Sequence, residues 1–263
     1  MSTASYAVRD SATMLRRNLR RTLRYPAVVA ATAGIPIVFL LLFVYVFGDT
    51  MGAGMAGVSG GRDEYLDYVT PGVILIAVAG AAQGTAISVA MDMTEGIVNR
   101  FRTMAIARVS VLTGHVVGSL IQTMVAIALV VGIALLLGFR PTASPVEWIA
   151  AVGLLAMIAF AVIWLAVAFG MVTKSVETAS NLPLPLILLP FLGSGFVPTD
   201  SMPTGMRWFA EYQPFTPIME TLRGLLLGTE IGASGVLAVA WSVGIGLVGY
   251  LWAKRLFNRD PRP

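Results

Sequence analysis

Residues 92–108, DMTEGIVNRFRTMAIAR, form a charged island between two long apolar stretches. Two acids come first, Asp92 and Glu95, and three arginines follow, at positions 100, 102 and 108. The flanking stretches of about 20 residues, each long enough to cross a membrane, carry almost no charge. Charged side chains gathered in this way suit contact with another protein. The chemistry that they predict is docking rather than catalysis.

The spacing within the island predicts a short helix. Asp92 followed three residues later by Glu95 is the pattern of a capping box with Asp92 as the N-cap. One apolar face is expected at helical spacing, from Ile97, Val98, Phe101 and Met104. The residues alone leave two interpretations equally open: an amphipathic helix by which another protein drives this one, and a solvated loop whose arginines fix the topology.

Ser234 and His115 are the residues from which a nucleophilic site would have to be built. Gly232 to Gly235, GASG, is similar to the serine motif of rhomboid-type intramembrane proteases. A serine nucleophile needs a base within hydrogen-bond reach, but the two residues are expected on opposite sides of a membrane. Ser234 is better interpreted as a helix N-cap, and His115 as an interface residue that anchors a span.

The chain contains one histidine and no cysteine, which leaves no set of residues suited to a metal ion. It also contains no Gly-Lys pair, so the glycine-rich stretch that begins at Gly48 lacks the ending of a phosphate-binding loop. We therefore expect no catalytic residue, no metal and no cofactor bound by this chain.

The composition is that of an integral membrane protein. Of 263 residues, 57% are hydrophobic and 12% are charged, against about 25% charged in an average soluble domain. The basic residues lie at the edges of apolar stretches rather than on one soluble face, so the net charge of +4 indicates membrane topology and not a nucleic-acid partner.

We predict an all-α fold with six transmembrane helices, at about residues 27–47, 68–91, 113–139, 148–172, 182–197 and 233–253. The transmembrane domain covers residues 26–257. Residues 1–25 form a cytoplasmic leader, either an amphipathic helix on the membrane surface or a solvated segment, and residues 258–263 form a basic tail. Gly80 and Gly84 allow close helix contact, within the chain or between subunits.

The region between the fifth and sixth spans has an unusual composition. Prolines and glycines interrupt 182–197, and the residues that follow mix aromatic and charged side chains. We expect a broken fifth helix followed by re-entrant or interfacial helices on the outer side, where irregular backbone must be covered by protein or line a wet cavity. The residues proposed for an outer gate there are Pro198, Trp208, Phe215, Pro217, Glu220 and Arg223.

The distribution of positive charge predicts the orientation. With six spans and both termini inside, fourteen of the 18 Lys and Arg residues fall on cytoplasmic segments, and the other four are Arg62, Arg140, Arg207 and Arg223. The positive-inside rule favours this arrangement. It also places the charged island in the cytoplasm.

Several phrases resemble a known family. TEGIVNRFRTMAIAR with the following Gly114-His115, YLDYVTPGVIL, FLGSGFVPTDSMP and FAEYQPFTPIMETLRGLLLG are similar to type-2 permease subunits of bacterial ATP-binding-cassette (ABC) exporters, in particular the daunorubicin-resistance-type drug-efflux permeases. The resemblance covers about residues 10–257. The chain departs from the pattern at Ala105, where relatives often carry proline, which puts in doubt only how the helix ends.

This resemblance implies a cytoplasmic coupling helix that docks in a cleft of a partner ATPase, an N-terminal interface helix and a re-entrant outer hairpin. The coupling residues that it implies are Asp92, Glu95, Gly96, Arg100, Phe101 and Arg102. It further implies two permease subunits, homo- or heterodimeric, with two separate ATPase subunits that use ATP and Mg. The permease itself would not be an enzyme.

The expected function is export of hydrophobic or amphipathic compounds, such as drugs or antibiotics, across the bacterial plasma membrane. An uncharged interior suits a lipid or a lipid-linked cell-envelope precursor equally well. A secondary transporter is the other alternative, although such carriers usually place carboxylates or basic groups inside the membrane, and the predicted spans contain no Asp, Glu, Lys or Arg.

Overall fold

The computed structural model describes residues 26–54, 61–94, 108–173 and 175–258. The regular elements in this part of the chain are all helices, and it contains no strand. The elements are, in order, α2 (Pro26–Leu42), the π-helical turn η1 (Phe43–Phe47), α3 (Gly48–Gly54), α4 (Arg62–Thr94), α6 (Arg108–Leu137), α7 (Pro145–Val172), α8 (Val176–Asn181), α9 (Leu184–Leu188), the 3-10 turn η2 (Thr199–Ser201), α10 (Thr204–Tyr212), α11 (Phe215–Leu227) and α12 (Ser234–Asn258).

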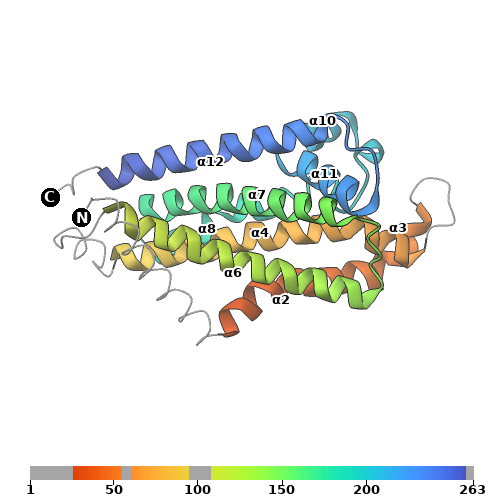
Figure 1. The fold of residues 1–263 in the computed structure, drawn as a ribbon, viewed down its shortest axis with the longest axis horizontal. Helices are drawn as coiled ribbons and strands as arrows, with labels where there is room; N and C mark the ends of the chain where they lie inside the picture. Colours follow the sequence, from red (N-terminus) through yellow and green to blue (C-terminus); the bar gives the residue numbers. More distant parts are fainter. Residues whose placement is uncertain (1–25, 55–60, 95–107, 174, 259–263) are drawn as a thin grey trace.

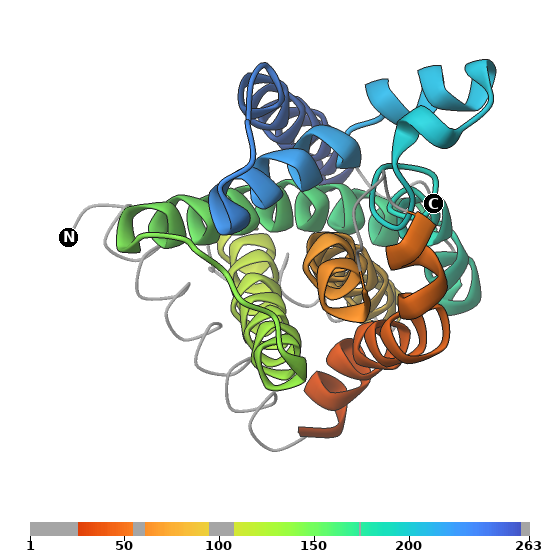
Figure 2. The ribbon, with the colours of Figure 1, turned by 90° about the vertical axis from the view of Figure 1, so that its right-hand side faces the viewer.

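Helix α4 forms the centre of the bundle. It packs against α2, α6, α7, α8, α9 and α11, and Figure 2 shows it enclosed by α2, α6 and α7 when the bundle is viewed end-on. Its sequence is apolar on nearly every side, as expected of a helix surrounded by other helices. α12 packs along α7 on the outside of the bundle (Figure 1).

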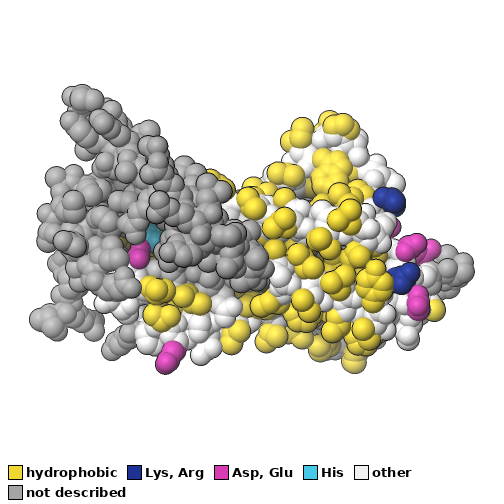
Figure 3. Space-filling model, turned by 90° about the horizontal axis from the view of Figure 1, so that it is seen from below, with side chains coloured by type: hydrophobic (Ala, Val, Ile, Leu, Met, Phe, Trp, Pro, Cys, Tyr) yellow, Lys and Arg dark blue, Asp and Glu magenta, His cyan; other side chains and the backbone are white. Residues whose placement is uncertain are grey.

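Five helices are long and apolar enough to cross a membrane: Thr32–Gly54, Arg62–Thr94, Thr113–Leu137, Pro145–Val172 and Ser234–Phe257. Each overlaps one of the predicted spans. The outward faces of α2, α6, α7 and α12 expose large apolar side chains, with Leu136 83% exposed. Figure 3 shows hydrophobic side chains over the middle of one face, with acidic and basic side chains near its ends. A multi-pass membrane protein presents this surface to lipid.

The predicted span at 182–197 is not a continuous helix, so six long helices are not found among the described residues. The short α9 gives way to a series of turns that continue to Val197. The physical reason is local, because prolines at 183, 185 and 190 remove backbone donors and glycines follow at 193 and 195. The residues between α7 and α10 nevertheless return from one end of the bundle to the other (Figure 1). We call residues 189–197 the non-helical segment.

The two ends of the bundle differ in content (Figure 1). One end, here called the C-terminal end, holds the last turns of α4, α7 and α12 and the start of α6. The other, here called the hairpin end, holds α3, the start of α4 and the consecutive helices α10 and α11. Helix α7 begins at the hairpin end with a capping box in which Ser144 and Glu147 bond each other's backbone N–H.

Candidate functional site

Polar side chains gather at both ends of the bundle. At the C-terminal end, Asp92 in the last turn of α4 lies against His115 in the second turn of α6. Imidazole Nε2 is 2.8 Å from carboxylate Oδ2, and both side chains are largely buried. Figure 3 shows the histidine beside an acidic side chain at this end. The pair therefore joins the end of α4 to the start of α6, the two helices that flank residues 95–107.

The prediction that Asp92 is an N-cap is wrong. Asp92 lies inside α4, which continues to Thr94, and its carboxylate meets a side chain of α6. The apolar pattern of α4 continues through Val89, Ala90 and Met93, and packing of these side chains extends the helix past the acid. The other proposed coupling residues lie outside the described residues, namely Glu95, Gly96, Arg100, Phe101 and Arg102.

Ser234 and His115 lie at opposite ends of the bundle. Ser234 is the first residue of α12, which begins at the hairpin end, whereas His115 is close to the start of α6 at the C-terminal end (Figure 1). The protease interpretation fails on this geometry. The interpretation of His115 as an anchor for its helix agrees with its contact to Asp92.

The hairpin end is organised around Arg223 of α11, which is only 4% exposed. Its Nε donates to Tyr68 O (3.1 Å), and Nη1 donates to Ser194 Oγ (3.3 Å) and to Glu220 Oε1 (2.7 Å). Nη2 donates to Ser194 O, and the guanidinium carbon lies 3.8 Å from the centre of the Tyr68 ring. We call these four residues the Arg223 cluster. It joins α4, the non-helical segment and α11.

Several interactions compensate the burial of this cation. Removing an arginine from water costs several kcal/mol unless its donors and its charge are satisfied. Glu220, three residues earlier on the same helix, supplies the opposite charge and keeps its side chain 38% exposed. The carbonyls of Tyr68 and Ser194 and the face of an aromatic ring complete the surroundings.

A second set of side chains bonds the backbone of the non-helical segment. Gln213 Nε2 donates to Leu189 O (3.3 Å), Ser194 N donates to Thr216 Oγ1 (3.2 Å), and Tyr65 OH donates to Phe196 O (3.3 Å). Irregular backbone at membrane depth needs partners for its polar groups, either within the protein or in a wet cavity. Side chains of α4, of α11 and of the link between α10 and α11 meet this requirement here.

Glycines allow the non-helical segment to approach its neighbours closely. A Cβ at Gly72 of α4 would lie 2.8 Å from Gly195 O, and a Cβ at Gly193 would lie 2.2 Å from Gln213 Nε2. Both distances are too short for a real side chain. By contrast, a Cβ at Gly80 or Gly84 would meet no described atom within 4 Å, so close packing within the described chain does not account for that predicted pair.

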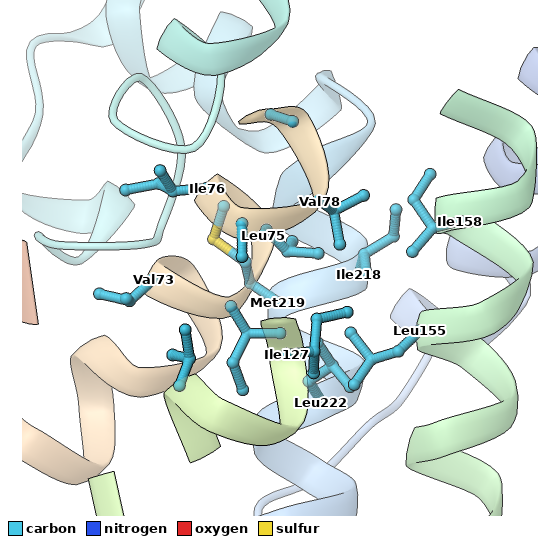
Figure 4. Packing of buried hydrophobic residues seen from close by; sticks show 14 of the residues in the cluster. Val73, Leu75, Ile76, Val78, Ile127, Leu155, Ile158, Ile218, Met219 and Leu222 are labelled. Carbon is cyan, nitrogen blue, oxygen red and sulfur yellow. The ribbon is translucent and has the colours of Figure 1, made fainter. Parts of the chain in front are cut away.

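Helix α11 is buried inside the hairpin end. Figure 4 shows its side chains meeting those of α4 and α7, with Ile218, Met219 and Leu222 facing Leu75, Val78, Leu155 and Ile158. Two of the proposed gate residues, Phe215 and Pro217, are buried on this helix. Pro198, another proposed gate residue, directly precedes η2. Trp208, also proposed for the gate, is 67% exposed on α10.

Helix α10 carries exposed apolar and aromatic side chains: Met206, Trp208, Phe209 and Tyr212. Its Arg207 forms ion pairs of 2.6 Å with both Asp200 and Glu211. The hydrogen bond to Glu211 and the charge of Asp200 raise the pKa of Arg207. Trp and Tyr on a short amphipathic helix are typical of the interface between membrane and water.

Five polar residues at the hairpin end were not singled out from the sequence as site residues: Tyr65, Tyr68, Ser194, Gln213 and Thr216. All five lie in the phrases that carry the family resemblance, YLDYVTPGVIL, FLGSGFVPTDSMP and FAEYQPFTPIMETLRGLLLG, and this is the one signal that could have pointed to them. In the described part of the chain, no three His, Asp or Glu side chains come together in a way suited to a metal ion.

Comparison with known proteins supplies the family. The family model described as "ABC-2 type transporter" matches residues 10–227. The daunorubicin resistance ABC transporter permease protein DrrB1 of Streptomyces coeruleorubidus is 29% identical over 243 residues, which cover 92% of this chain and 80% of the relative. The probable doxorubicin resistance ABC transporter permease protein DrrC of Mycobacterium tuberculosis strain H37Rv is 22% identical over 238 residues, covering 90% and 84%.

Proposed function

The chain belongs to the ABC-2 type transporter family, and we propose that it is the transmembrane permease subunit of an ATP-driven exporter whose ATPase is a separate chain. The family match over residues 10–227, on a chain with five membrane-length helices, carries this proposal. The working complex contains two permease subunits, identical or different, and two ATPase subunits, which bind the ATP and Mg. Energy then comes from the ATPases, which move the permease by contacting it differently in their two states.

The proposed orientation follows from charge. The C-terminal end of the bundle faces the bacterial cytoplasm with both termini and residues 95–107, and the hairpin end faces outward. The residues between α7 and α10 then serve as the fifth of six crossings, in broken form, and α10–α11 is the re-entrant outer hairpin. The aromatic side chains of α10 suit the outer membrane interface.

The proposed coupling site is the cytoplasmic segment between α4 and α6. Asp92 precedes this segment, in the last turn of α4, and through His115 it links the two helices that would receive the movement. The proposal assigns ATPase docking to Glu95, Gly96, Arg100, Phe101 and Arg102. This role rests on the family and on the charge pattern.

Replacement of the charged coupling residues tests that role. We expect Glu95→Ala and Arg102→Ala to fold and reach the membrane but to weaken ATPase association and to lower transport. Arg140→Ala, which removes a positive side chain at the hairpin end, is the matched control. Co-purification of the ATPase measures docking, and unchanged docking and transport in both coupling variants would refute the assignment.

We propose hydrophobic or amphipathic drugs as the substrate, since the two relatives carry daunorubicin and doxorubicin resistance in their names. Inverted vesicles that contain the permease and its partner ABC ATPase should accumulate daunorubicin only with ATP. A hydrolysis-deficient ATPase is the control. If daunorubicin fails and a fluorescent phospholipid is moved instead, the substrate is a lipid-like precursor. If neither is moved and no ATPase associates, the exporter proposal is wrong.

A further inference from the structure

Along most of its length, α4 forms hydrogen bonds with the residues that follow α7, where the chain forms only short helices and turns. Near its middle, Gln83 Nε2 donates to Ser180 O at the end of α8 (2.8 Å). Near its start, Tyr65 OH donates to Phe196 O (3.3 Å), and the carbonyl of Tyr68 accepts from Arg223 (3.1 Å). The residues that lack a long helix of their own are thus attached to the central helix of the bundle.

Arg223 joins three elements. Its guanidinium reaches α4 through a carbonyl and a ring face of Tyr68, the non-helical segment through the backbone and hydroxyl of Ser194, and α11 through Glu220. A planar group with donors on three nitrogens makes these contacts at once. A lysine, as a single point of charge, cannot reproduce both the fork and the stacking.

The backbones beside this cluster are in direct contact. Gly72, one turn after Tyr68, approaches Gly195 so closely that a Cβ would lie 2.8 Å from its oxygen. No water or side chain fits between α4 and the non-helical segment at this point. Movement of α4 here must displace the segment unless the contact opens.

We propose that Arg223 is a positioning residue that clamps the non-helical segment and α11 onto α4, so that the hairpin end moves with α4 as one body. The inference rests on the proposed function in one respect: α4 leads directly into the cytoplasmic residues assigned to the ATPase. A displacement applied beyond Thr94 is then carried along α4 to the hairpin end. The Arg223 cluster is the contact that converts it into movement of the outer region.

The clamp can be measured in the permease alone. The chain has no cysteine, so spin labels attach only at the engineered sites Glu64→Cys, on the exposed start of α4, and Ser201→Cys, on the exposed η2 turn. Electron paramagnetic resonance in lipid nanodiscs, with labelled protein diluted by unlabelled protein, gives the distance distribution between α4 and the outer region. With Arg223 present we expect one narrow distribution.

Arg223→Met should broaden this distribution and add a longer-distance component. Arg223→Lys should do the same, because it keeps the charge but not the fork. Arg207→Met is the matched control, since it removes an arginine that also pairs with an acid on its own helix but is exposed, and its distribution should match the parent. A parent-like distribution in folded Arg223→Met, or in Arg223→Lys, overturns the clamp.

Variants of Tyr68 keep the test decisive if Arg223→Met does not fold. Tyr68→Phe retains the ring face under the guanidinium and should stay closer to the parent than Tyr68→Leu, which removes it. Equal distributions in these two variants overturn the inference.

The clamp and the proposed function fail in different experiments. The distance measurement needs no ATPase, so a parent-like distribution in Arg223→Lys refutes the clamp and leaves export intact. Absence of ATP-dependent transport by the unaltered complex refutes the function and leaves the distances unchanged. When both hold, Arg223→Lys should move less substrate for each ATP hydrolysed, and Arg207→Met should match the parent.

Discussion

The C-terminal end and the hairpin end of the bundle use charge in different ways. At the C-terminal end, one carboxylate and one imidazole meet where two neighbouring helices, α4 and α6, come together. At the hairpin end, one arginine binds residues 29 and 155 positions away, and glycines let backbones touch. The first arrangement joins helices flanking one short stretch of chain. The second holds together three elements that are distant in sequence, so its loss should disturb more of the structure.

Removal of Arg223 should have the largest effect on stability. Arg223→Met leaves the carbonyls of Tyr68 and Ser194 buried with fewer donors, and each unsatisfied group costs about 1–3 kcal/mol. Thermal unfolding in detergent should therefore show a clear loss, whereas Arg207→Met removes only exposed, water-screened ion pairs and should change the melting temperature little. Equal melting temperatures for the two variants would show that the two arginines, and the two kinds of environment, do not differ.

Alanine substitutions at two glycines of α4, Gly72 and Gly80, compare the tight backbone contact with a position that has open space beside it. Gly72→Ala forces a Cβ into the backbone of Gly195 and should destabilise the protein by about 1–3 kcal/mol, as overpacking does. Gly80→Ala meets no described atom within 4 Å and should be neutral or should stabilise by up to about 1 kcal/mol through helix propensity. The same unfolding measurement checks both. A harmful Gly80→Ala with a harmless Gly72→Ala would reverse the assignment of the close contact.

The pair at the C-terminal end should show smaller but mutual effects. A double-mutant cycle with Asp92→Asn and His115→Asn should give a coupling energy of about 0.5–1.5 kcal/mol, because the two side chains are in contact. Thr123→Val, on the same helix as His115 but with its hydroxyl bonded to Ser119 O of that helix, should add independently to Asp92→Asn. A coupling energy of zero would show that the contact between Asp92 and His115 does not help to hold α4 and α6 together.

The ease of prediction from sequence also differs between the two ends. The apolar stretches that became α2, α4, α6, α7 and α12 are long and uncharged, and composition alone predicts such spans. The break at 182–197 was predicted from its prolines and glycines, since these act locally. The contacts of Arg223 were not, because Tyr68 and Ser194 become its neighbours only when distant parts of the chain pack together. For the same reason the sequence pattern wrongly predicts a cap at Asp92, since its partner His115 lies on the next helix.

Substitution of Trp208 should cause the smallest change in stability, and the fluorescence of Trp208 should report on the environment of the hairpin end. It is exposed on α10, so Trp208→Ala should alter stability by less than about 0.5 kcal/mol. Its indole ring suits the boundary between lipid headgroups and acyl chains. In a variant that keeps Trp208 as the single tryptophan, lipids brominated near the headgroup should quench its fluorescence more than lipids brominated near the chain ends. Equally weak quenching of the fluorescence by both lipids would place α10 in water or against protein. Stronger quenching by the deeper label would place it within the bilayer core, where the ion pairs of Arg207 with Asp200 and Glu211 would lose the water that solvates them.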